Sequence, residues 1–290
     1  MSGEPKVGHY QDSKYRQSHH WVLSYLQDRA SLHRSFLYQH SDPDGLIKRI
    51  DQFLKAADRH KISTIFCIFD DCAFSCKEPY LGRQDDPIPG VHNSGWTPSP
   101  GHERVVDRLT WPQLENFVTT VVLRFAGDQR ILAWDIYNEP GNGGMGDESL
   151  PLFREAFRWA YNGKPEQSLT TAIWDKSLQG VTKAMLKLSD IITFHNYGDL
   201  LSVQKQVSDL KSYGRPVICT EWMARHHNSL FRAHLPFFKR EKIGCYCWGL
   251  PPGAAEPDVW FQDLLHLNGK PYREKEIEVI REHIQNSMKE

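Results

Sequence analysis

The chain has 290 residues, of which 40% are hydrophobic; this is enough for a full core and argues against long disordered segments. It carries 35 Lys and Arg against 36 Asp and Glu, so charge gives no basis for expecting nucleic acid or an anionic membrane as a partner. No apolar run reaches the length of a spanning helix, so we expect no membrane insertion. The length of the chain suits one large domain, and we predict a single domain over residues 1–290.

The N-terminal segment is polar and has no clear hydrophobic period. Residues 1–20 are rich in His, Tyr and Lys, which predicts a loosely packed arm. The segment lacks the apolar core of a signal peptide, which predicts a cytoplasmic protein as the chain stands, or a secreted one if the N-terminus is truncated. The six cysteines include no C-x-x-C pair, which favours free thiols and a reducing compartment.

From residue 42 onward, helical and strand-like patterns alternate. Asp42 and Pro43 are typical of a helix start, and a long loop rich in Pro and Gly is predicted over residues 72–110. Strands are predicted at residues 21–26 (weakly), 63–69, 131–137, 169–174, 190–194, 216–220 and 244–250. Helices are predicted from residue 42 through the late 50s and at residues 111–125, 149–161, 177–188, 201–213, 229–239 and 274–287. Short apolar strands bounded by helices indicate a parallel sheet with helical crossovers.

Polar or aromatic residues follow the ends of the predicted strands. In chain order these ends carry Asp70-Asp71, Asn138-Glu139, Asp175, His195-Asn196-Tyr197, Glu221-Trp222 and Trp248. In a closed α/β barrel the carboxyl ends of the strands meet on one face, where the chemistry is found. Read alone, Glu139 is also consistent with a solvated loop residue.

Two of these strand ends offer glutamates, Glu139 and Glu221. Two carboxyls facing one cleft can divide glycoside hydrolysis between them: one protonates the leaving oxygen, and the other attacks the anomeric carbon or activates water. Neighbouring aromatic side chains provide faces on which a sugar packs. The candidate substrate-binding residues are therefore Asn138, His195, Tyr197, Trp248, Asp71 and Trp174.

Other interpretations of the same residues remain open. Singly, His195 is consistent with a structural histidine, and Tyr197 and Trp248 with core residues. A metal-dependent hydrolase with Asp70, Asp71, His92 and His195 as ligands is a further alternative, although their spacing matches no recognised ligand set. We predict neither a metal nor a cofactor.

The ordered set of strand-end motifs resembles the retaining (β/α)8-barrel glycoside hydrolases of clan A, and looks most like family 5, the cellulase-like group. The resemblance covers about residues 42–285 and rests on Asn138-Glu139-Pro140, His195-Asn196-Tyr197, Glu221 and Trp248 at the fourth, sixth, seventh and eighth strands. It implies a TIM barrel that cleaves a β-linked oligo- or polysaccharide, with Glu139 as acid/base and Glu221 as nucleophile. It also implies that Asn138 holds the sugar 2-hydroxyl, Tyr197 orients the nucleophile, and His195 and Trp248 line the sugar subsite.

The N-terminal part departs from this pattern. Counting backward makes residues 21–26 the second strand, which leaves little chain for the first strand and its helix. Members of the family carry an arginine on the second strand, and WVLSYL contains none. The expected barrel is thus either completed by residues 1–40 or lacks its first strand–helix unit. We expect a monomer, or a dimer if the barrel is open, because an open barrel leaves two sheet edges unpaired. The alternative function is an inactive or weakly active carbohydrate-binding barrel.

Overall fold

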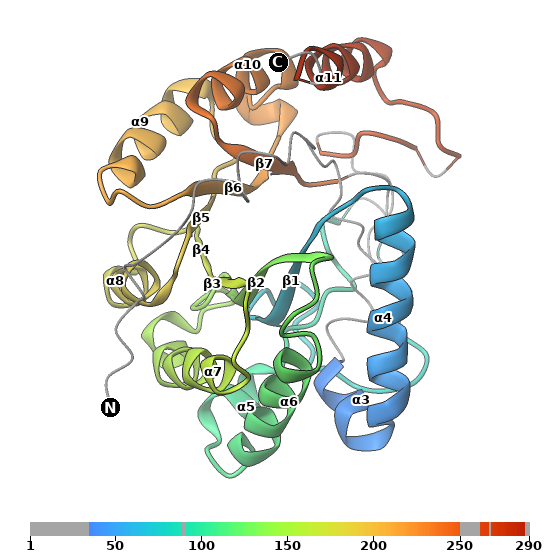
Figure 1. Ribbon diagram of the computed structural model, residues 1–290, viewed down its shortest axis with the longest axis vertical. Helices are drawn as coiled ribbons and strands as arrows, with labels where there is room; N and C mark the ends of the chain where they lie inside the picture. The colour runs from blue at the N-terminus through green and yellow to red at the C-terminus, as the bar shows by residue number, and fades with distance from the viewer. Residues whose placement is uncertain (1–34, 87, 89–90, 250–261, 267, 288–290) are drawn as a thin grey trace.

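The strands of the protein form an arc around the middle of the molecule, and the helices lie outside them (Figure 1). The computed structural model describes residues 35–86, 88, 91–249, 262–266 and 268–287. Within these residues the strands are β1 (Thr64–Asp70), β2 (Ile131–Asn138), β3 (Ser168–Thr170), β4 (Ala172–Ile173), β5 (Ile192–His195), β6 (Val217–Trp222) and β7 (Gly244–Cys247).

The helices alternate with these strands, as the hydrophobic pattern predicts. They are α3 (Ser35–Ser41), α4 (Pro43–Arg59), α5 (His102–Val106), α6 (Trp111–Arg124), α7 (Leu150–Asn162), α8 (Gln179–Leu188), α9 (Leu200–Lys211), α10 (Phe231–Glu241) and α11 (Glu274–Ser287), with short 3-10 turns η1 (Gly146–Ser149) and η2 (Arg225–His227). The predicted start of α4 is confirmed, because the Asp42 carboxylate accepts a hydrogen bond from the Gly45 N–H at 3.0 Å and Pro43 occupies the first turn.

The strands pair in parallel in the orders β1-β2-β3 and β4-β5-β6-β7. The prediction of one strand over residues 169–174 is wrong in one respect. The strand is interrupted at Thr171, so that β3 pairs with β2 and β4 pairs with β5. The Thr171 hydroxyl instead donates to the Tyr137 carbonyl of β2 at 2.6 Å. This bond crosses the junction of the two sheets at a position where the backbone ladder is broken.

The predicted α/β architecture is confirmed, whereas closure of the barrel is not shown. No pairing joins β1 to β7 within the described ranges. The predicted second strand at residues 21–26 and the expected arm at residues 1–20 both lie outside those ranges. The described chain therefore supplies the third to eighth positions of the expected barrel, with β3 and β4 together occupying one position.

Aromatic side chains pack between the first sheet and its helices. Phe69 of β1 contacts Phe117 of α6 and Tyr137 of β2, with ring centroids 5.9 and 5.7 Å apart, and Tyr137 contacts Phe153 of α7 at 6.3 Å. All four side chains are at most 1% exposed. This packing fixes β1 and β2 firmly, and the ends of these strands carry half of the site described below.

The predicted long loop folds back over the end of β1. Ser99 and Asp70 exchange two backbone hydrogen bonds of 2.7 Å, and the Ser75 N–H donates to the Trp96 carbonyl at 2.9 Å. The loop is thus shorter than expected, because α5 already begins at residue 102. Its effect is to hold Trp96 against the strand end.

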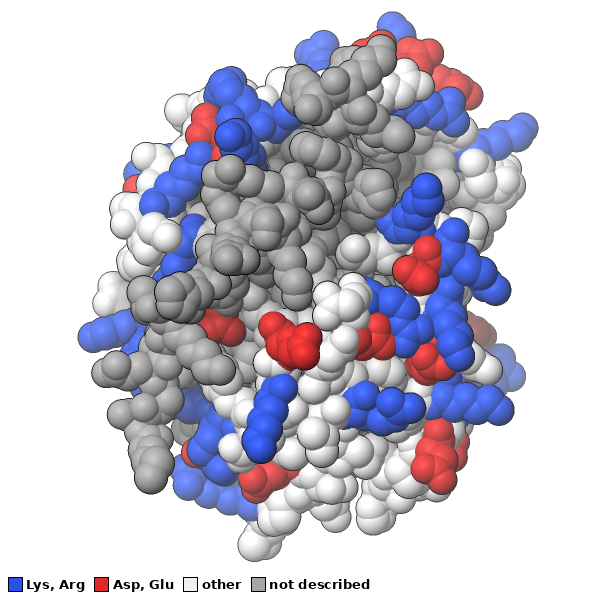
Figure 2. All heavy atoms as spheres, viewed as in Figure 1, with Lys and Arg blue, Asp and Glu red and all other residues white. Residues whose placement is uncertain are grey.

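The cysteines are free and the surface charges are mixed, as the sequence predicts. Each of the six cysteines is free, as expected, and Cys72, Cys219, Cys245 and Cys247 are buried. Lys and Arg side chains are interspersed with Asp and Glu on the face shown in Figure 2. Among the described helices, none is long and apolar enough to cross a membrane.

Candidate active site

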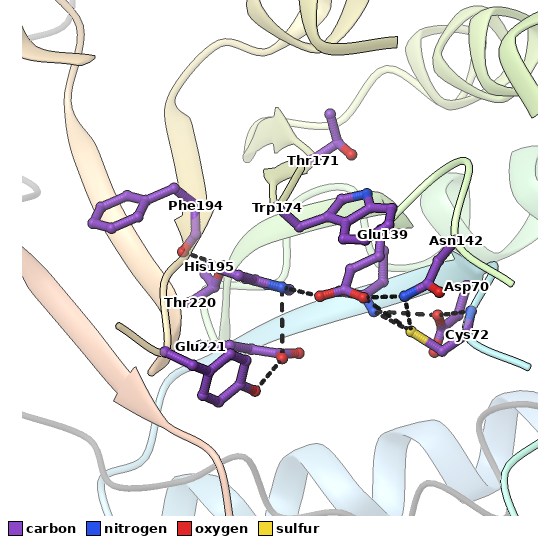
Figure 3. A network of polar contacts seen from close by, with 12 residues as sticks. Asp70, Cys72, Glu139, Asn142, Thr171, Trp174, Phe194, His195, Thr220 and Glu221 are labelled. Carbon is purple, nitrogen blue, oxygen red and sulfur yellow. Dashed lines mark hydrogen bonds and ion pairs between the residues drawn. The ribbon is translucent and has the colours of Figure 1, made fainter. Parts of the chain in front are cut away.

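The carboxyl ends of β1, β2, β5 and β6 bring one polar network together (Figure 3). At its centre, His195 Nδ1 lies 2.6 Å from Glu139 Oε1 and 3.5 Å from Glu221 Oε2. Ligand atoms of these three side chains all lie within 4.8 Å of one another. The two glutamates selected from the sequence are therefore close together, with the histidine between them.

Glu139 follows the last residue of β2 in a strained conformation. Its φ of 43° lies in the left-handed region, which is uncommon for a residue other than glycine and is typically maintained only by strong surrounding contacts. Its Oε1 accepts from His195, while Oε2 accepts from Asn142 Nδ2 at 2.5 Å and from the Cys72 thiol at 3.2 Å. Three donors thus fix a carboxyl group that is almost fully buried.

Glu221 lies within β6 and is also buried. Its Oε2 accepts a hydrogen bond of 2.6 Å from the hydroxyl of Tyr197, which follows β5. Its backbone carbonyl accepts from the Asn196 N–H at 3.0 Å, which ties the end of β5 to β6. The carboxylate and the tyrosine that orients it are therefore held by neighbouring strands.

Proton affinity in this network favours an ion pair between His195 and Glu139. Burial by itself lowers the pKa of His195, but the negative charge of Glu221 and the hydrogen bond and charge of Glu139 outweigh burial and raise it. Burial likewise acts to raise the pKa of Glu139, and here the hydrogen bond and charge of His195 outweigh it and lower the pKa. Both shifts favour the form in which His195, rather than Glu139, carries the proton.

Asp70 holds a second layer beneath this network. Its carboxylate accepts from the Cys72 N–H at 2.8 Å, from Asn138 Nδ2 at 3.2 Å and from Trp96 Nε1 at 3.1 Å. The Asn138 side chain therefore uses its amide nitrogen on Asp70, while its Oδ1 is buried without a hydrogen-bond partner in the described chain. An unsatisfied buried acceptor beside Glu139 is a place where a ligand hydroxyl can donate.

The position of Asp71 does not fit the substrate contact expected from its place at a strand end. It is fully buried, and its oxygens accept from the Tyr137 hydroxyl, the Gly141 N–H and the Ser149 hydroxyl at 2.7, 2.7 and 2.5 Å. Burial raises its pKa to about 6, although these hydrogen bonds oppose the rise. Asp71 therefore fastens the loop after β2 that carries Asn142.

Two cavities open beside the glutamates. One, the Trp248 pocket, has a volume of about 330 Å³ and is lined by Cys72, Phe74, His92, Asn93, Glu139, Tyr197, Glu221, Ala224, His226, His227, Trp248 and Gln262. The other, the Trp174 pocket, has a volume of about 420 Å³ and is lined by Glu139, Trp174, Lys176, His195, Asn196, Tyr197, Ser202, Lys205 and Gln206. Glu139 and Tyr197 line both pockets, so the two pockets adjoin at these side chains; together they are called the cleft below.

The aromatic candidates take different places in this cleft. Trp248 lines its pocket beside Trp96, with ring centroids 5.8 Å apart. Trp174 lines the other pocket, and its Nε1 donates to the Pro140 carbonyl at 3.2 Å. Each pocket thus has an indole in its wall, and an indole is the kind of surface on which a sugar ring packs.

The metal site considered from the sequence does not assemble. Asp70, Asp71, His92 and His195 form no cluster of ligand atoms in the part of the chain that the structure describes. The group that does lie within 4.8 Å is Glu139, His195 and Glu221. Two of these three side chains, His195 and Glu139, are joined directly by a 2.6 Å hydrogen bond.

Three residues of the network, Cys72, Asn142 and Trp96, were not among the site residues selected from the sequence, although Trp96 lies in the long loop that was expected to be functional. Cys72 and Asn142 contact Glu139 directly, and Trp96 pairs with Trp248. Asn142 lies three residues after Glu139, in the loop that follows the strand end, and this position was the only available signal. Cys72 and Trp96 come from the long loop, whose course depends on tertiary contacts.

No protein-family model matches the chain, and no curated protein sequence does either. Solved structures do match, and those compared are glycoside hydrolases of the clan A type. The family 5 enzyme GH5_18 from Streptomyces cattleya, in complex with GlcNAc, is 12% identical with a TM-score of 0.58, over 88% of this chain and 70% of that one. The structure named XacCel5A is 15% identical with a TM-score of 0.53, over 83% and 78%.

A β-glucuronidase from Bifidobacterium dentium also matches, at 14% identity and a TM-score of 0.52 over 81% of this chain. The chain spans only 38% of that enzyme's length. At these identities the comparisons show the fold alone, which is similar to that of clan A glycoside hydrolases. Membership of family 5 stays a prediction.

Proposed function

We propose that the chain is a retaining glycoside hydrolase that cleaves β-linked oligo- or polysaccharides by double displacement. The observation that carries the proposal is the buried pair Glu139 and Glu221, which have carboxylate oxygens within 4.8 Å of each other. Retaining enzymes hold their two carboxyls about 5–5.5 Å apart, and inverting enzymes about 6.5–9.5 Å apart to admit a water. The short separation therefore supports direct attack by a carboxylate.

In the first step the Glu221 carboxylate attacks the anomeric carbon, and the bond to the leaving oxygen breaks as Glu139 gives that oxygen a proton. In the second step Glu139 takes a proton from water, the water oxygen attacks the same carbon, and the bond to Glu221 breaks. The proton for the first step comes from His195 along the 2.6 Å hydrogen bond. Tyr197 orients the nucleophile, and the unpaired Asn138 Oδ1 accepts from a sugar hydroxyl.

Variants of the two glutamates test the proposal. Glu221→Gln is expected to abolish hydrolysis of aryl β-glycosides, because the amide cannot attack. Glu139→Ala is expected to slow substrates with poor leaving groups far more than activated ones, with azide partly restoring the rate. Glu148→Gln, at an exposed position of the η1 turn, is the matched control and should keep full activity. Unchanged activity in both active-site variants would refute the assignment.

Binding of carbohydrate without turnover is the second candidate function. It is favoured by the lowered pKa of Glu139, which His195 produces against the effect of burial, because a general acid must carry its proton before it acts. An oligosaccharide panel distinguishes the two: saturable binding by calorimetry with no product by chromatography selects the binding protein, whereas released reducing sugar selects the hydrolase.

A further inference from the structure

The two pockets of the cleft differ in which glutamates line them. The Trp248 pocket is lined by both Glu139 and Glu221, whereas only Glu139 lines the Trp174 pocket. In double displacement, the sugar that is attacked must contact the nucleophile, and the leaving group must lie beside the acid. The attacked sugar therefore belongs in the Trp248 pocket and the leaving group in the Trp174 pocket. This orientation rests on the function proposed above.

The Trp174 pocket is rich in positive charge. Lys176 enters it from the loop after β4, and Lys205 enters it from α9. Lys205 has no acidic partner among the described residues, and Lys176 has only Asp209, at 3.5 Å, with both of these side chains more than half exposed. A single exposed pair of this kind is weak and leaves Lys176 able to attract another anion.

Nearby acidic groups do not cancel this charge. Glu139 is the carboxylate that lines the pocket, and it is paired with His195 at 2.6 Å. Asp175 accepts hydrogen bonds from the backbone and hydroxyl of Ser177, and Asp199 caps the start of α9; neither lines the pocket. Two ammonium groups are therefore left facing a cavity of about 420 Å³.

We propose that the Trp174 pocket selects a leaving-group sugar that carries an anionic substituent, a carboxylate or a sulfate, held by Lys176 and Lys205. The indole of Trp174 supplies the face against which the ring packs. The neutral polar side chains of Asn196 and Gln206 supply hydrogen-bonding groups in the same wall, and Asn196 Nδ2 donates to Gln206 Oε1 at 2.7 Å. The preferred substrate is thus charged on the leaving side of the bond that is cleaved.

Paired aryl β-glycosides test this selectivity. Glucosides, mannosides, xylosides and glucuronides are prepared with 4-carboxyphenyl and with neutral 4-carbamoylphenyl leaving groups, and kcat/KM is measured for both. The parent should favour the carboxylate, and this preference should fall about 1.4- to 5-fold for each of Lys176→Gln and Lys205→Gln. Added salt should weaken the preference. Lys187→Gln, exposed on α8 and outside the pocket, is the matched control.

A binding measurement keeps this inference separate from the proposed activity. In the Glu221→Gln variant the Trp174 pocket is intact, because Glu221 does not line it. NMR titration of that variant with methyl β-D-glucuronide, methyl β-D-glucoside 6-sulfate and methyl β-D-glucoside should show tighter binding of one or both anions, lost in the two lysine variants. Preference for the carboxylate or for the sulfate identifies the natural substituent. Equal binding of all three sugars, or a preference that survives Lys205→Gln, overturns the inference, even if aryl glycosides are hydrolysed.

Discussion

The ion pair between Arg225 and Glu276 supports one wall of the cleft and is open to a direct test. Arg225 Nε lies 3.0 and 3.2 Å from the two carboxylate oxygens of Glu276, and a further guanidinium nitrogen lies 2.5 Å from Oε2. The side chains are only 2% and 13% exposed. Arg225 belongs to η2, which lines the Trp248 pocket through His226 and His227, while Glu276 belongs to α11.

Removing one partner of this buried pair should lower the free energy of unfolding far more than removing one partner of an exposed pair. Loss of one member of a buried ion pair typically costs about 3–5 kcal/mol, because the other charge stays buried without compensation. Glu276 is slightly exposed, so Glu276→Ala is expected near the lower end, at about 3 kcal/mol of unfolding free energy. Glu278→Ala, at an exposed position of the same helix, should change stability by less than about 0.5 kcal/mol.

Urea unfolding followed by tryptophan fluorescence measures both values, provided that the slope with denaturant stays constant. The double variant Arg225→Met, Glu276→Leu removes both charges and should be more stable than Glu276→Ala alone, since no unpaired charge remains. If Glu276→Ala and Glu278→Ala unfold at the same urea concentration, the pair does not stabilise this wall and the reasoning fails.

Three further predictions concern the network itself. Tyr197→Phe removes a 2.6 Å hydrogen bond to Glu221, so kcat/KM on aryl β-glycosides should fall about 10- to 100-fold with unfolding unchanged; an undiminished rate would mean that the bond does not orient the nucleophile. Because folding raises the pKa of His195, protonated His195 adds to the free energy of unfolding. This contribution is complete below pH 6.5, the ordinary pKa of histidine, and is lost as pH rises through the raised pKa of the folded protein. His195→Gln should abolish the loss of stability that urea unfolding shows in the parent as pH rises above 6.5, whereas a loss that persists in the variant would assign it to another group. Thr171→Val should lower the free energy of unfolding by about 1–3 kcal/mol, because it removes the hydroxyl that donates to the buried Tyr137 carbonyl. Thr171→Ser keeps the hydroxyl and should stay close to the parent. Equal losses in the two variants would exclude the hydrogen bond as the cause.

Much of the fold was predictable because its strands and helices differ sharply in hydrophobic period. The apolar run that forms β2 and the capped start of α4 each satisfy several rules at once, so local and global preferences agree. The break at Thr171 was not predictable, because the residues of β3 and β4 continue the same strand-like pattern on both sides of it. The interruption comes from a tertiary hydrogen bond to β2, which leaves no trace in local sequence.

The candidate site was predictable only as far as strand ends reveal it. Glu139 and Glu221 could be selected because parallel strands bring their carboxyl ends together. The same rule placed Asp71 in the cleft wrongly, since it does not say which of two successive residues faces the ligand. Asp70 turns toward Trp96, and Asp71 turns toward the loop after β2. Loop residues such as Cys72 required the folded chain.

The two glutamates lie on different sheets, so their separation depends on structure that neither strand provides alone. Glu139 follows β2 in the first sheet, and Glu221 lies within β6, one residue before its end, in the second. Strained residues occur at both strand ends, with φ of 43° at Glu139 and 83° at Met223, and turn the chain away from the strand direction just where the carboxyls are presented. Thr171 joins the sheets by one hydroxyl, and His195 joins the carboxyls by one proton. The geometry on which the proposed chemistry depends therefore rests on the core shared by the two sheets and on hydrogen bonds that cross between them at Thr171 and His195.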